Sequence, residues 1–206
     1  MKNMKIKTRS KSEIKRKKIL EAATHLFTNN SYAATSMDLI AQRAEVSKQT
    51  VYSHFGSKDE LFTAAIEKRC DSYRMVDFML DDLVDPKTAL YTLAQRFLTM
   101  LTSKEALAVH RICAYESKSY PKLSELFFQA GPERITNRIT EFMELLNKRK
   151  ILKIENPRFA ALQFLSLIKG EIWIRVEFNT KHQLSQNDID AYLLSSVELF
   201  MLGYRC

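Results

Sequence analysis

The stretch from Thr35 to Phe62, TSMDLIAQRAEVSKQTVYSHFGSKDELF, restricts the possible folds of this chain more than any other part. It contains two short segments with helical spacing of apolar residues, MDLIAQRA and KQTVYSHF, separated by only three residues. That spacing is typical of two helices joined by a tight turn, the helix-turn-helix arrangement. We therefore expect helices over about 36–43 and 48–54, and a third that begins after Ser57.

Hydroxyl side chains stand at the expected start of each helix. Thr35 precedes Asp38 by three residues, and Ser57 precedes Glu60 by three residues. Both patterns predict a capping box, in which a hydroxyl and a carboxylate satisfy backbone N–H groups at a helix start. Ser47 is placed to cap the middle helix. The three predicted starts strengthen the helix-turn-helix interpretation.

Several separate positions carry a family pattern. IA, then A-x-VS, then Y-x-HF-x-SK-x-x-LF occur at 40–41, 44–47 and 52–62. With these residues, the run 26–66 resembles the DNA-binding domain of the TetR/AcrR family of transcriptional regulators. One residue departs from the family pattern: Glu45 stands where a glycine is common. A left-handed backbone there would cost a non-glycine residue about 1 kcal/mol.

The expected recognition helix spans about 48–54. At about 100° per residue, Val51 and Phe55 lie together and face a small core, so Gln49 and Ser53 face outward. Glutamine suits a bidentate contact with adenine, and the threonine methyl group suits thymine. For any single side chain, a merely solvated residue is the alternative. The predicted DNA-contacting residues are Thr35, Ser36, Ser47, Lys48, Gln49, Thr50, Tyr52, Ser53, His54 and Lys58, the last at a helix start suited to phosphate.

The excess positive charge is confined to one end. Residues 1–18 contain nine Lys or Arg and one Glu, which equals the net charge of +8 for the whole chain. We expect a basic arm that follows DNA phosphates beside the motif. A solvated tail is the alternative.

The remaining sequence indicates an all-α fold. Only 4 Gly and 4 Pro occur, and the turn clusters that separate short strands are absent. We predict a basic flexible arm at 1–11, a three-helix DNA-binding domain at 12–57, a connecting helix within 58–84 that runs to about Asp81, and a larger helical domain at 85–206. Further helices are expected over about 87–103 and 104–117, from 121 with an interruption or kink at Gly131-Pro132, to about 150, from 157, and over 186–203.

A second resemblance covers roughly 112–170. The segments YESKSYPKLSELFFQAGPERITNRITEFM and ENPRFAALQFLSLIKG are similar to the effector domain of the AefR-like branch of the same family. The resemblance implies a repressor with a cavity for a small molecule. For each side chain alone, ordinary core packing is the alternative. The predicted ligand-binding residues are Phe97, Met100, Leu101, His110, Tyr115, Phe128, Phe164 and Trp173.

The last two expected helices are apolar over wide sectors. This favours a four-helix interface between two protomers, with a thick monomer core as the alternative. A helix-turn-helix protein of this class reads two half-sites, which also favours a homodimer. The residues concerned are Ala160, Phe164, Leu167, Ile168, Leu193, Leu194, Val197, Phe200 and Met201.

Other classes of protein are not indicated. No phosphate-binding glycine loop, nucleophile elbow or paired metal-ligand motif occurs, so we expect no enzyme activity, no cofactor and no metal. The acidic residues Asp77, Asp81, Asp82 and Asp85 have no regular ligand spacing. No apolar run is long enough to span a bilayer and no secretory signal is evident, so a cytoplasmic location is expected. Cys113 is interpreted as a small buried hydrophobe, with a redox sensor as the alternative.

These patterns lead to one functional hypothesis and two alternatives. The hypothesis is a ligand-responsive repressor that binds double-stranded DNA as a homodimer on a near-palindromic operator and is released by a small apolar or amphipathic effector. One alternative is a transcriptional activator of the same fold. The other is an architectural nucleic-acid-binding protein in which the basic arm does most of the binding.

Overall fold

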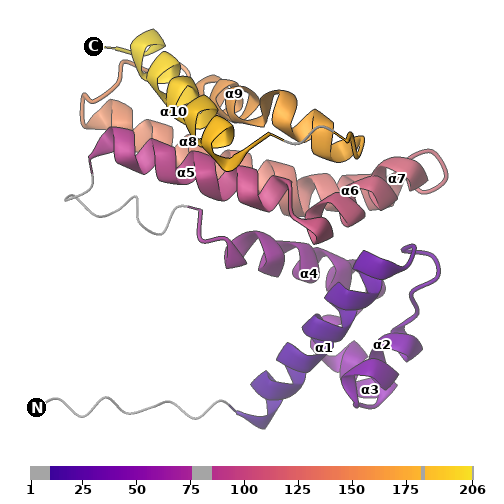
Figure 1. Ribbon diagram of the computed structural model, residues 1–206. Coiled ribbons are helices and arrows are strands. Elements are labelled where there is room, and N and C mark those ends of the chain that lie inside the picture. The colour runs from indigo at the N-terminus through magenta and orange to yellow at the C-terminus, as the bar shows by residue number, and fades with distance from the viewer. Residues whose placement is uncertain (1–9, 76–84, 182–183, 206) are drawn as a thin grey trace, which may run out of the picture.

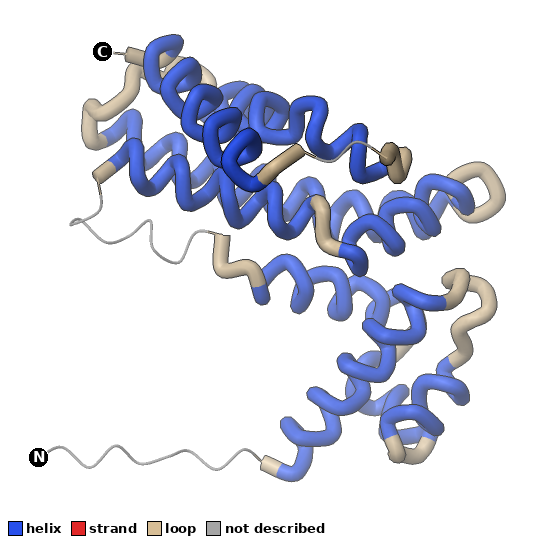
Figure 2. The backbone as a smooth tube through the Cα atoms, in the orientation of Figure 1, coloured by secondary structure: helices blue, strands red, loops and turns tan. Residues whose placement is uncertain are grey.

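The computed structural model describes residues 10–75, 85–181 and 184–205. These residues form helices joined by turns and include no strand (Figure 2), so the prediction of an all-α fold is confirmed. The helices are α1 (Lys11–Asn29), α2 (Met37–Ala44), α3 (Lys48–Phe55), α4 (Lys58–Ser72), α5 (Pro86–Leu101), α6 (Lys104–Glu116), α7 (Pro121–Phe128), the π-helical turn η1 (Gln129–Glu133), α8 (Arg134–Lys148), α9 (Pro157–Glu177) and α10 (Gln186–Gly203).

The helices form two units, which we call the N-terminal unit (α1 to α4) and the C-terminal unit (α5 to α10). In Figure 1, α1, α2 and α3 lie at one end of the molecule, and α5, α8, α9 and α10 form a bundle at the other. Helix α4 runs between them and contacts α1, α7 and η1. It is therefore the element that connects the two units.

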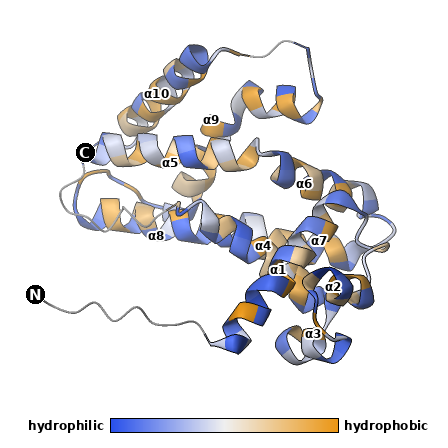
Figure 3. Cartoon of the chain, turned by 60° about the horizontal axis from the view of Figure 1, so that its bottom comes forward, coloured by the Kyte–Doolittle hydropathy of each residue, from blue (hydrophilic) through white to orange (hydrophobic). Residues whose placement is uncertain are grey.

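The core of the N-terminal unit extends into the C-terminal unit. Side chains on α1 to α4 bury a common apolar cluster, and in Figure 3 hydrophobic residues gather where α4 and α7 meet. Val109 and Cys113 of α6 and Leu123 of α7 belong to the same cluster, and Leu123 has no exposed surface. The two units thus share a hydrophobic core rather than touching at a polar boundary.

The C-terminal unit has its own core, between α5, α8, α9 and α10. Phe164 of α9 lies at its centre without exposed surface, and its ring packs edge-on against Phe200 of α10 at 5.1 Å between centroids. Burial of apolar side chains from four helices supplies most of the free energy that holds such a bundle together.

The helix starts largely follow their predicted caps. Ser47 Oγ accepts from Thr50 N at 3.2 Å, and Ser57 Oγ accepts from Glu60 N at 3.1 Å. The capping prediction for Thr35 was wrong, because Ser36 is the residue whose Oγ accepts from the α2 backbone, at 3.1 Å from Leu39 N. The Thr35 hydroxyl is buried and donates to the Ser31 carbonyl instead. An adjacent serine competes for the same capping position, so the sequence pattern selected the wrong hydroxyl by one residue.

Helix α4 is shorter than predicted. It ends at Ser72 rather than near Asp81, and Arg74 follows in a left-handed conformation with φ 48°. This backbone turns the chain away from the helix axis. Residues 76–84, which include Asp77, Asp81 and Asp82, lie outside the described residues. Asp85 caps α5 by accepting from Thr88 N at 2.9 Å.

Two helical segments contain irregular backbone. The predicted irregularity at Gly131-Pro132 takes the form of the wide π turn η1, which joins α7 to α8 without a break. A π turn accommodates a proline that cannot donate to the preceding turn. Helix α9 has a kink at Gly170, with φ 38° and ψ −150°, which the sequence analysis did not anticipate. The Tyr192 hydroxyl donates to the Leu167 carbonyl at this kink, at 2.6 Å.

Candidate nucleic-acid interface and ligand cavity

Helix α3 presents one buried face and one exposed polar face. Val51 and Phe55 are buried against the N-terminal unit, as the 100° calculation predicted. Gln49, Tyr52 and Ser53 are exposed on the other side. The buried pair fixes the orientation of the helix, and the exposed residues are free to contact a partner surface.

The turn between α2 and α3 adopts the conformation that glycine favours. Glu45 has φ 55° and ψ 44°, which is left-handed, and its backbone N–H caps α2 by donating to carbonyls of the last turn. Its carboxylate accepts a hydrogen bond from Lys18 of α1 at 3.1 Å, although both side chains are at least half exposed. An exposed ion pair contributes little. The sharp turn between α2 and α3 therefore requires a strained backbone at Glu45.

We expect Glu45→Gly to raise the free energy of unfolding by about 0.5–1 kcal/mol. Relief of a left-handed conformation, worth about 1–2 kcal/mol, exceeds the extra backbone entropy that glycine loses on folding. Chemical denaturation midpoints measure the change. Glu45→Ala is the matched control, because it removes the contact with Lys18 and leaves the strained backbone. If the glycine variant is less stable than the alanine variant, which also lacks the ion pair, relief of strain does not exceed the entropy that glycine loses, and this interpretation is wrong.

Two lysines predicted to contact phosphates already have partners. The Lys48 ammonium lies 2.9 Å from Asp38 Oδ2, and this hydrogen bond raises the pKa of Lys48. Lys58 Nζ lies 4.1 Å from the centroid of the Tyr32 ring, and burial lowers its pKa. Lys48 and Asp38 are both more than half exposed, so solvent and salt weaken their pair. Lys48 is accordingly the more available of the two lysines.

The other predicted contact residues lie at the starts of α2 and α3 and near the end of α3. Ser36 and Ser47 are exposed caps, and the Ser47 and Thr50 hydroxyls are 2.8 Å apart. His54 is half-buried beside Phe55. Thr35 has no exposed surface, which contradicts its prediction as a contact residue, because the buried hydroxyl serves the Ser31 carbonyl.

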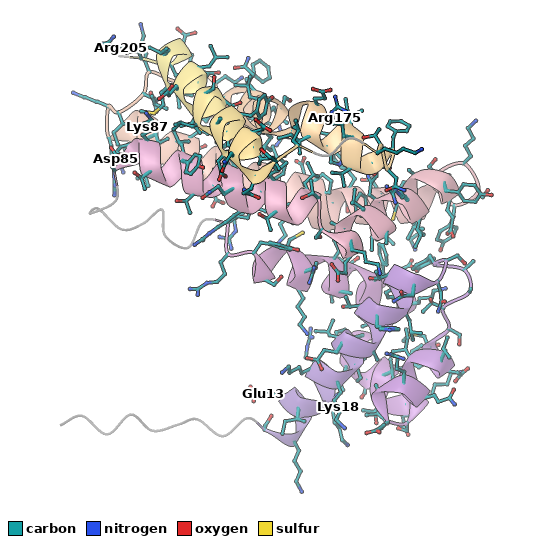
Figure 4. The ribbon with its side chains drawn as sticks, viewed as in Figure 1. Glu13, Lys18, Asp85, Lys87, Arg175 and Arg205 are labelled. Atoms are coloured by element: carbon teal, nitrogen blue, oxygen red, sulfur yellow. The ribbon has the colours of Figure 1, made fainter. Side chains whose placement is uncertain are left out.

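Basic side chains from α1 lie beside this face. The Arg16 guanidinium sits over the Phe55 ring at 4.3 Å and so connects α1 to α3. Glu13 and Lys18 mark the first half of α1, at the end of the molecule remote from Arg205 (Figure 4). Residues 1–9 of the predicted arm lie outside the described residues. The basic residues from Lys11 to Lys18 are exposed and extend the polar surface of α3.

A cavity of about 410 Å³ lies between the two units. Its size is within the usual range for small-molecule sites. Six of the eight predicted ligand-binding residues line it: Phe97, Met100, Leu101, His110, Phe128 and Trp173.

The remaining two predicted ligand-binding residues do not face the cavity. Tyr115 was predicted to face the interior but is 90% exposed, because it lies on the solvent side of α6. Phe164 packs in the core of the C-terminal unit against Phe200 instead. Both were predicted because they are large aromatic side chains on expected helices. The sequence does not show which other helix, or solvent, each face of a helix contacts.

The N-terminal unit contributes one wall of the cavity, which no sequence pattern predicted. Thr24, Phe27 and Thr28 of α1 and Ile66 and Arg69 of α4 line the cavity. Phe27 and Ile66 fit the apolar spacing of their helices, the two threonines and Arg69 are polar, and no local pattern indicates which of these positions border an empty space. Glu105 and Lys169 also line the cavity and were not predicted.

Ion pairs connect the two units around the cavity. Arg69 of α4 donates to Glu105 of α6 at 2.8 Å, and Arg134 of α8 donates to both carboxylate oxygens of Asp71, at 3.0 and 3.1 Å. The Asp71 contact raises the pKa of Arg134. Each pair joins α4 to a different helix of the C-terminal unit, so the position of α4 depends on both.

A third connection lies at the start of α4. Asp59 accepts a hydrogen bond from the Tyr32 hydroxyl and forms an ion pair with Lys122 of α7. The Lys122 contact is the main cause that lowers the pKa of Asp59. The Tyr32 ring stacks on Tyr120 at 5.5 Å between centroids. The beginning of α4 is thus held to the C-terminal unit, as its last turn is.

Helices α9 and α10 expose apolar side chains as well as burying them. Six of the residues predicted for a dimer interface lie in the protomer's own core, namely Ala160, Phe164, Ile168, Leu193, Val197 and Phe200. Leu194 is the one predicted residue among the large exposed apolar side chains, and the others come from further positions on or next to the two helices. Its large members are Phe159, Leu162, Ile174, Phe178, Tyr192, Leu194, Leu199 and Leu202.

The described residues contain no group of three or more side chains suited to a metal ion. Within the same ranges, no helix combines the length and apolar character needed to cross a bilayer. Cys113 is buried, and burial raises the pKa of its thiol to about 12, which disfavours the reactive thiolate.

Two family models match the sequence. Residues 88–206 match the model described as AefR-like transcriptional repressor, C-terminal domain, and residues 19–65 match the model described as bacterial regulatory proteins, tetR family. Together they cover both units of the structure.

Known proteins of this kind match over most of the chain. The negative transcriptional regulator IcaR of the biofilm operon icaADBC in Staphylococcus epidermidis is 24% identical, over 89% of this chain and 97% of IcaR. A TetR-family regulator from Mesorhizobium loti superposes with a TM-score of 0.79 at 26% identity, covering 96% of this chain and 100% of the other. The flavonoid-responsive regulator FrrA superposes with a TM-score of 0.74 at 30% identity, covering 93% and 97%. Two curated relatives with higher local identity align with this chain over only about a quarter of their own length.

Proposed function

Because the chain belongs to the TetR family of bacterial regulatory proteins, with a C-terminal domain of the AefR-like repressor type, we propose that it is a homodimeric repressor released from its operator by a small effector. DNA binding and transcription regulation follow from the family. Repression, dimerisation and effector response are the proposed parts. The observation that carries the proposal is the exposed polar face of α3, held by Val51 and Phe55, together with a cavity that touches the same unit.

We assign sequence reading to the exposed face of α3. Gln49 reads adenine through its amide, Thr50 offers a methyl group to thymine, and Tyr52 and Ser53 contact neighbouring base edges or the backbone. Support comes from their shared face and from the exposure of Gln49, whose side chain has no hydrogen-bond partner among the described residues. Phosphate contacts come from Ser36, Ser47, Lys48, His54 and Lys58, and from the basic arm.

We assign dimerisation to the exposed apolar side chains of α9 and α10. Phe159, Leu199 and Leu202 are each about 60% exposed, so a monomer would leave a large apolar surface in water. A self-complementary pairing of the two helices with those of a second protomer covers it. The two α3 helices are then placed to read two half-sites.

We assign effector binding to the cavity between the units. Its occupant touches α1 and α4 on one side and α5, α6 and α9 on the other. Repression is relieved when the effector prefers a conformation in which α4, and with it α3, no longer matches the operator spacing. FrrA, by its name, responds to flavonoids, which are aromatic molecules, and the aromatic lining of this cavity is compatible with that class.

Footprinting of the DNA beside its own gene tests the proposal. We expect protection of two half-sites about one helical turn apart, with specific binding stronger than binding to random DNA. Equal binding to operator and random DNA would contradict it. A reporter driven by the protected promoter distinguishes repression from activation. Removal of residues 1–12 distinguishes the architectural alternative, because a repressor keeps its preferred site with weaker affinity, whereas an architectural protein loses nearly all binding.

A further inference from the structure

We propose that the cavity selects aromatic molecules that carry an anionic group, and that Lys169 is the residue that binds the anion. The inference depends on the proposed effector-binding role of the cavity and narrows it to a chemical class. It is carried by the aromatic rings in the lining, by the charges that face the cavity and by the kink in α9.

The cavity has a largely apolar lining, to which several helices contribute aromatic rings. Phe27 comes from α1, Phe97 from α5, Phe127 and Phe128 from the end of α7, and Trp173 from α9. Rings from four helices surround a space of about 410 Å³. Aromatic side chains pack well against flat aromatic ligands in offset or edge-on geometry. The body of the occupant is therefore aromatic.

The charged groups that line the cavity do not balance. Arg69 is neutralised by Glu105 at 2.8 Å and also donates to the Tyr73 hydroxyl at 3.0 Å. Lys169 also lines the cavity, and its contact in the described structure is with the Trp173 ring, at 3.6 Å from the centroid. No ion pair of Lys169 with a carboxylate is found among the described residues. The lining thus has one cation more than it has anions, with histidine taken as neutral.

His110 does not change this balance. Its imidazole packs edge-on against Trp173 at 5.5 Å between centroids, and its Nε2 lies 3.8 Å from Glu177. The Glu177 carboxylate is also 3.6 Å from Arg111 Nε, so it is shared by groups on α6. Glu177 is absent from the cavity lining. Glu171, the other carboxylate of α9, pairs with Arg175. Both carboxylates of α9 are therefore engaged with other side chains than Lys169.

The kink at Gly170 places Lys169 for this role. Gly170 follows Lys169 directly, and Trp173 comes three residues after the kink. The Tyr192 hydroxyl donates a hydrogen bond to the Leu167 carbonyl at 2.6 Å, and this bond stabilises the kinked backbone. An ammonium above the indole face and an aromatic wall beside it form a joint site for a ring that bears a carboxylate.

Titration with a matched pair of probes tests the inference. Biphenyl-4-carboxylate and biphenyl-4-carboxamide have the same ring system and differ in charge. Calorimetry gives both affinities, and the fluorescence of Trp173, the only tryptophan in the chain, reports whether the probe enters the cavity. We expect the carboxylate to bind about tenfold more tightly or better, as a charge-assisted hydrogen bond predicts.

Variants assign the preference to one side chain. Lys169→Met is expected to reduce carboxylate affinity to that of the amide and to leave amide affinity within about twofold, whereas Lys169→Arg keeps the preference. Lys148→Met, on the exposed side of α8, is the control and should change neither affinity. A preference that survives Lys169→Met but is lost in Arg69→Met would show that Arg69 is the partner and that the assignment is wrong.

Two further outcomes overturn the inference without touching the proposed function. Equal affinity for both probes removes the selectivity for anions, and failure of both to alter Trp173 fluorescence removes the aromatic class. Operator binding of the same preparation is measured in parallel. Specific footprints with no carboxylate preference refute only this inference, whereas loss of specific footprints refutes the proposed DNA-binding regulator.

Discussion

Gly170→Ala is expected to lower the free energy of unfolding by about 3 kcal/mol, equivalent to a fall of roughly 10 °C in the melting temperature. Two costs add. At φ 38° and ψ −150° the backbone is in a region that side chains with a Cβ rarely adopt. A Cβ at this position would also overlap the Tyr192 hydroxyl and lie 2.8 Å from its Cζ. Thermal and chemical denaturation measure the loss.

Gly203→Ala is the matched control, because no atom lies within 4 Å of a Cβ built there. We expect a change of less than about 0.5 kcal/mol for this exposed surface position. A comparison of Gly170→Ala with and without Tyr192→Ala separates the steric cost from the backbone cost, since only the latter persists when the ring is removed. If Gly170→Ala is as stable as the parent, α9 is not kinked at this residue.

Gln49→Ala is expected to weaken operator binding by about 1–3 kcal/mol per half-site, or roughly 5- to 150-fold, and to relax the preference at one base pair. The reason is that Gln49 is exposed on α3, where its amide is placed to read a base edge. Because a homodimer uses two copies, the total loss is about twice that of one half-site. Binding assays with a set of single-base operator variants measure both effects.

Two variants serve as comparisons for Gln49→Ala. Gln42→Ala, on the exposed side of α2, removes the same amide outside the predicted face and should leave the base preference unchanged. Lys48→Ala should weaken binding to all DNA sequences by a similar factor. It should also reduce the salt dependence of binding by about one released counterion per half-site. If Gln49→Ala and Lys48→Ala give the same uniform loss, α3 does not read bases.

The helices that the sequence predicted best have unambiguous local signals. Helix α10 was predicted at its observed bounds, because Ser185 and Gly203 enclose a continuous apolar pattern. The faces of α3 followed from the fixed rotation per residue, which needs no tertiary information. Thr35 failed because two adjacent hydroxyls offer the same capping signal, and the choice between them depends on burial.

The cavity was only partly predictable for a different reason. His110 and Trp173 were identified as amphipathic side chains on helices expected to face inward, and both line the cavity. Tyr115 has the same chemistry but lies on the other side of α6. Phe27 was assigned to the core of the N-terminal unit, where it does belong, while part of its surface also borders the cavity. A residue that serves a core and a cavity at once gives one periodic signal, so the sequence cannot separate the two roles.

The kink in α9 shows a further limit of pattern reading. A single glycine inside a long apolar segment is compatible with a straight helix at a modest cost. What decides its conformation is Tyr192, which is 22 residues away and approaches the backbone closely in the folded chain. Such a pairing depends on how α10 packs on α9, and it has no signature in the local sequence.

The core shared by α1, α4, α6 and α7 limits how this protein can be rebuilt into hybrid sensors. Leu123, Val109 and Cys113 complete the packing of the N-terminal unit, so a chimera joined after α4 would set these side chains against a foreign surface. Consider a hybrid that keeps the promoter specificity of this protein but responds to a different effector. It must include α6 and α7 together with α1 to α4, or the contact between them must be redesigned. The practical module for exchange is therefore discontinuous in sequence, even though the helix-turn-helix itself is a contiguous stretch.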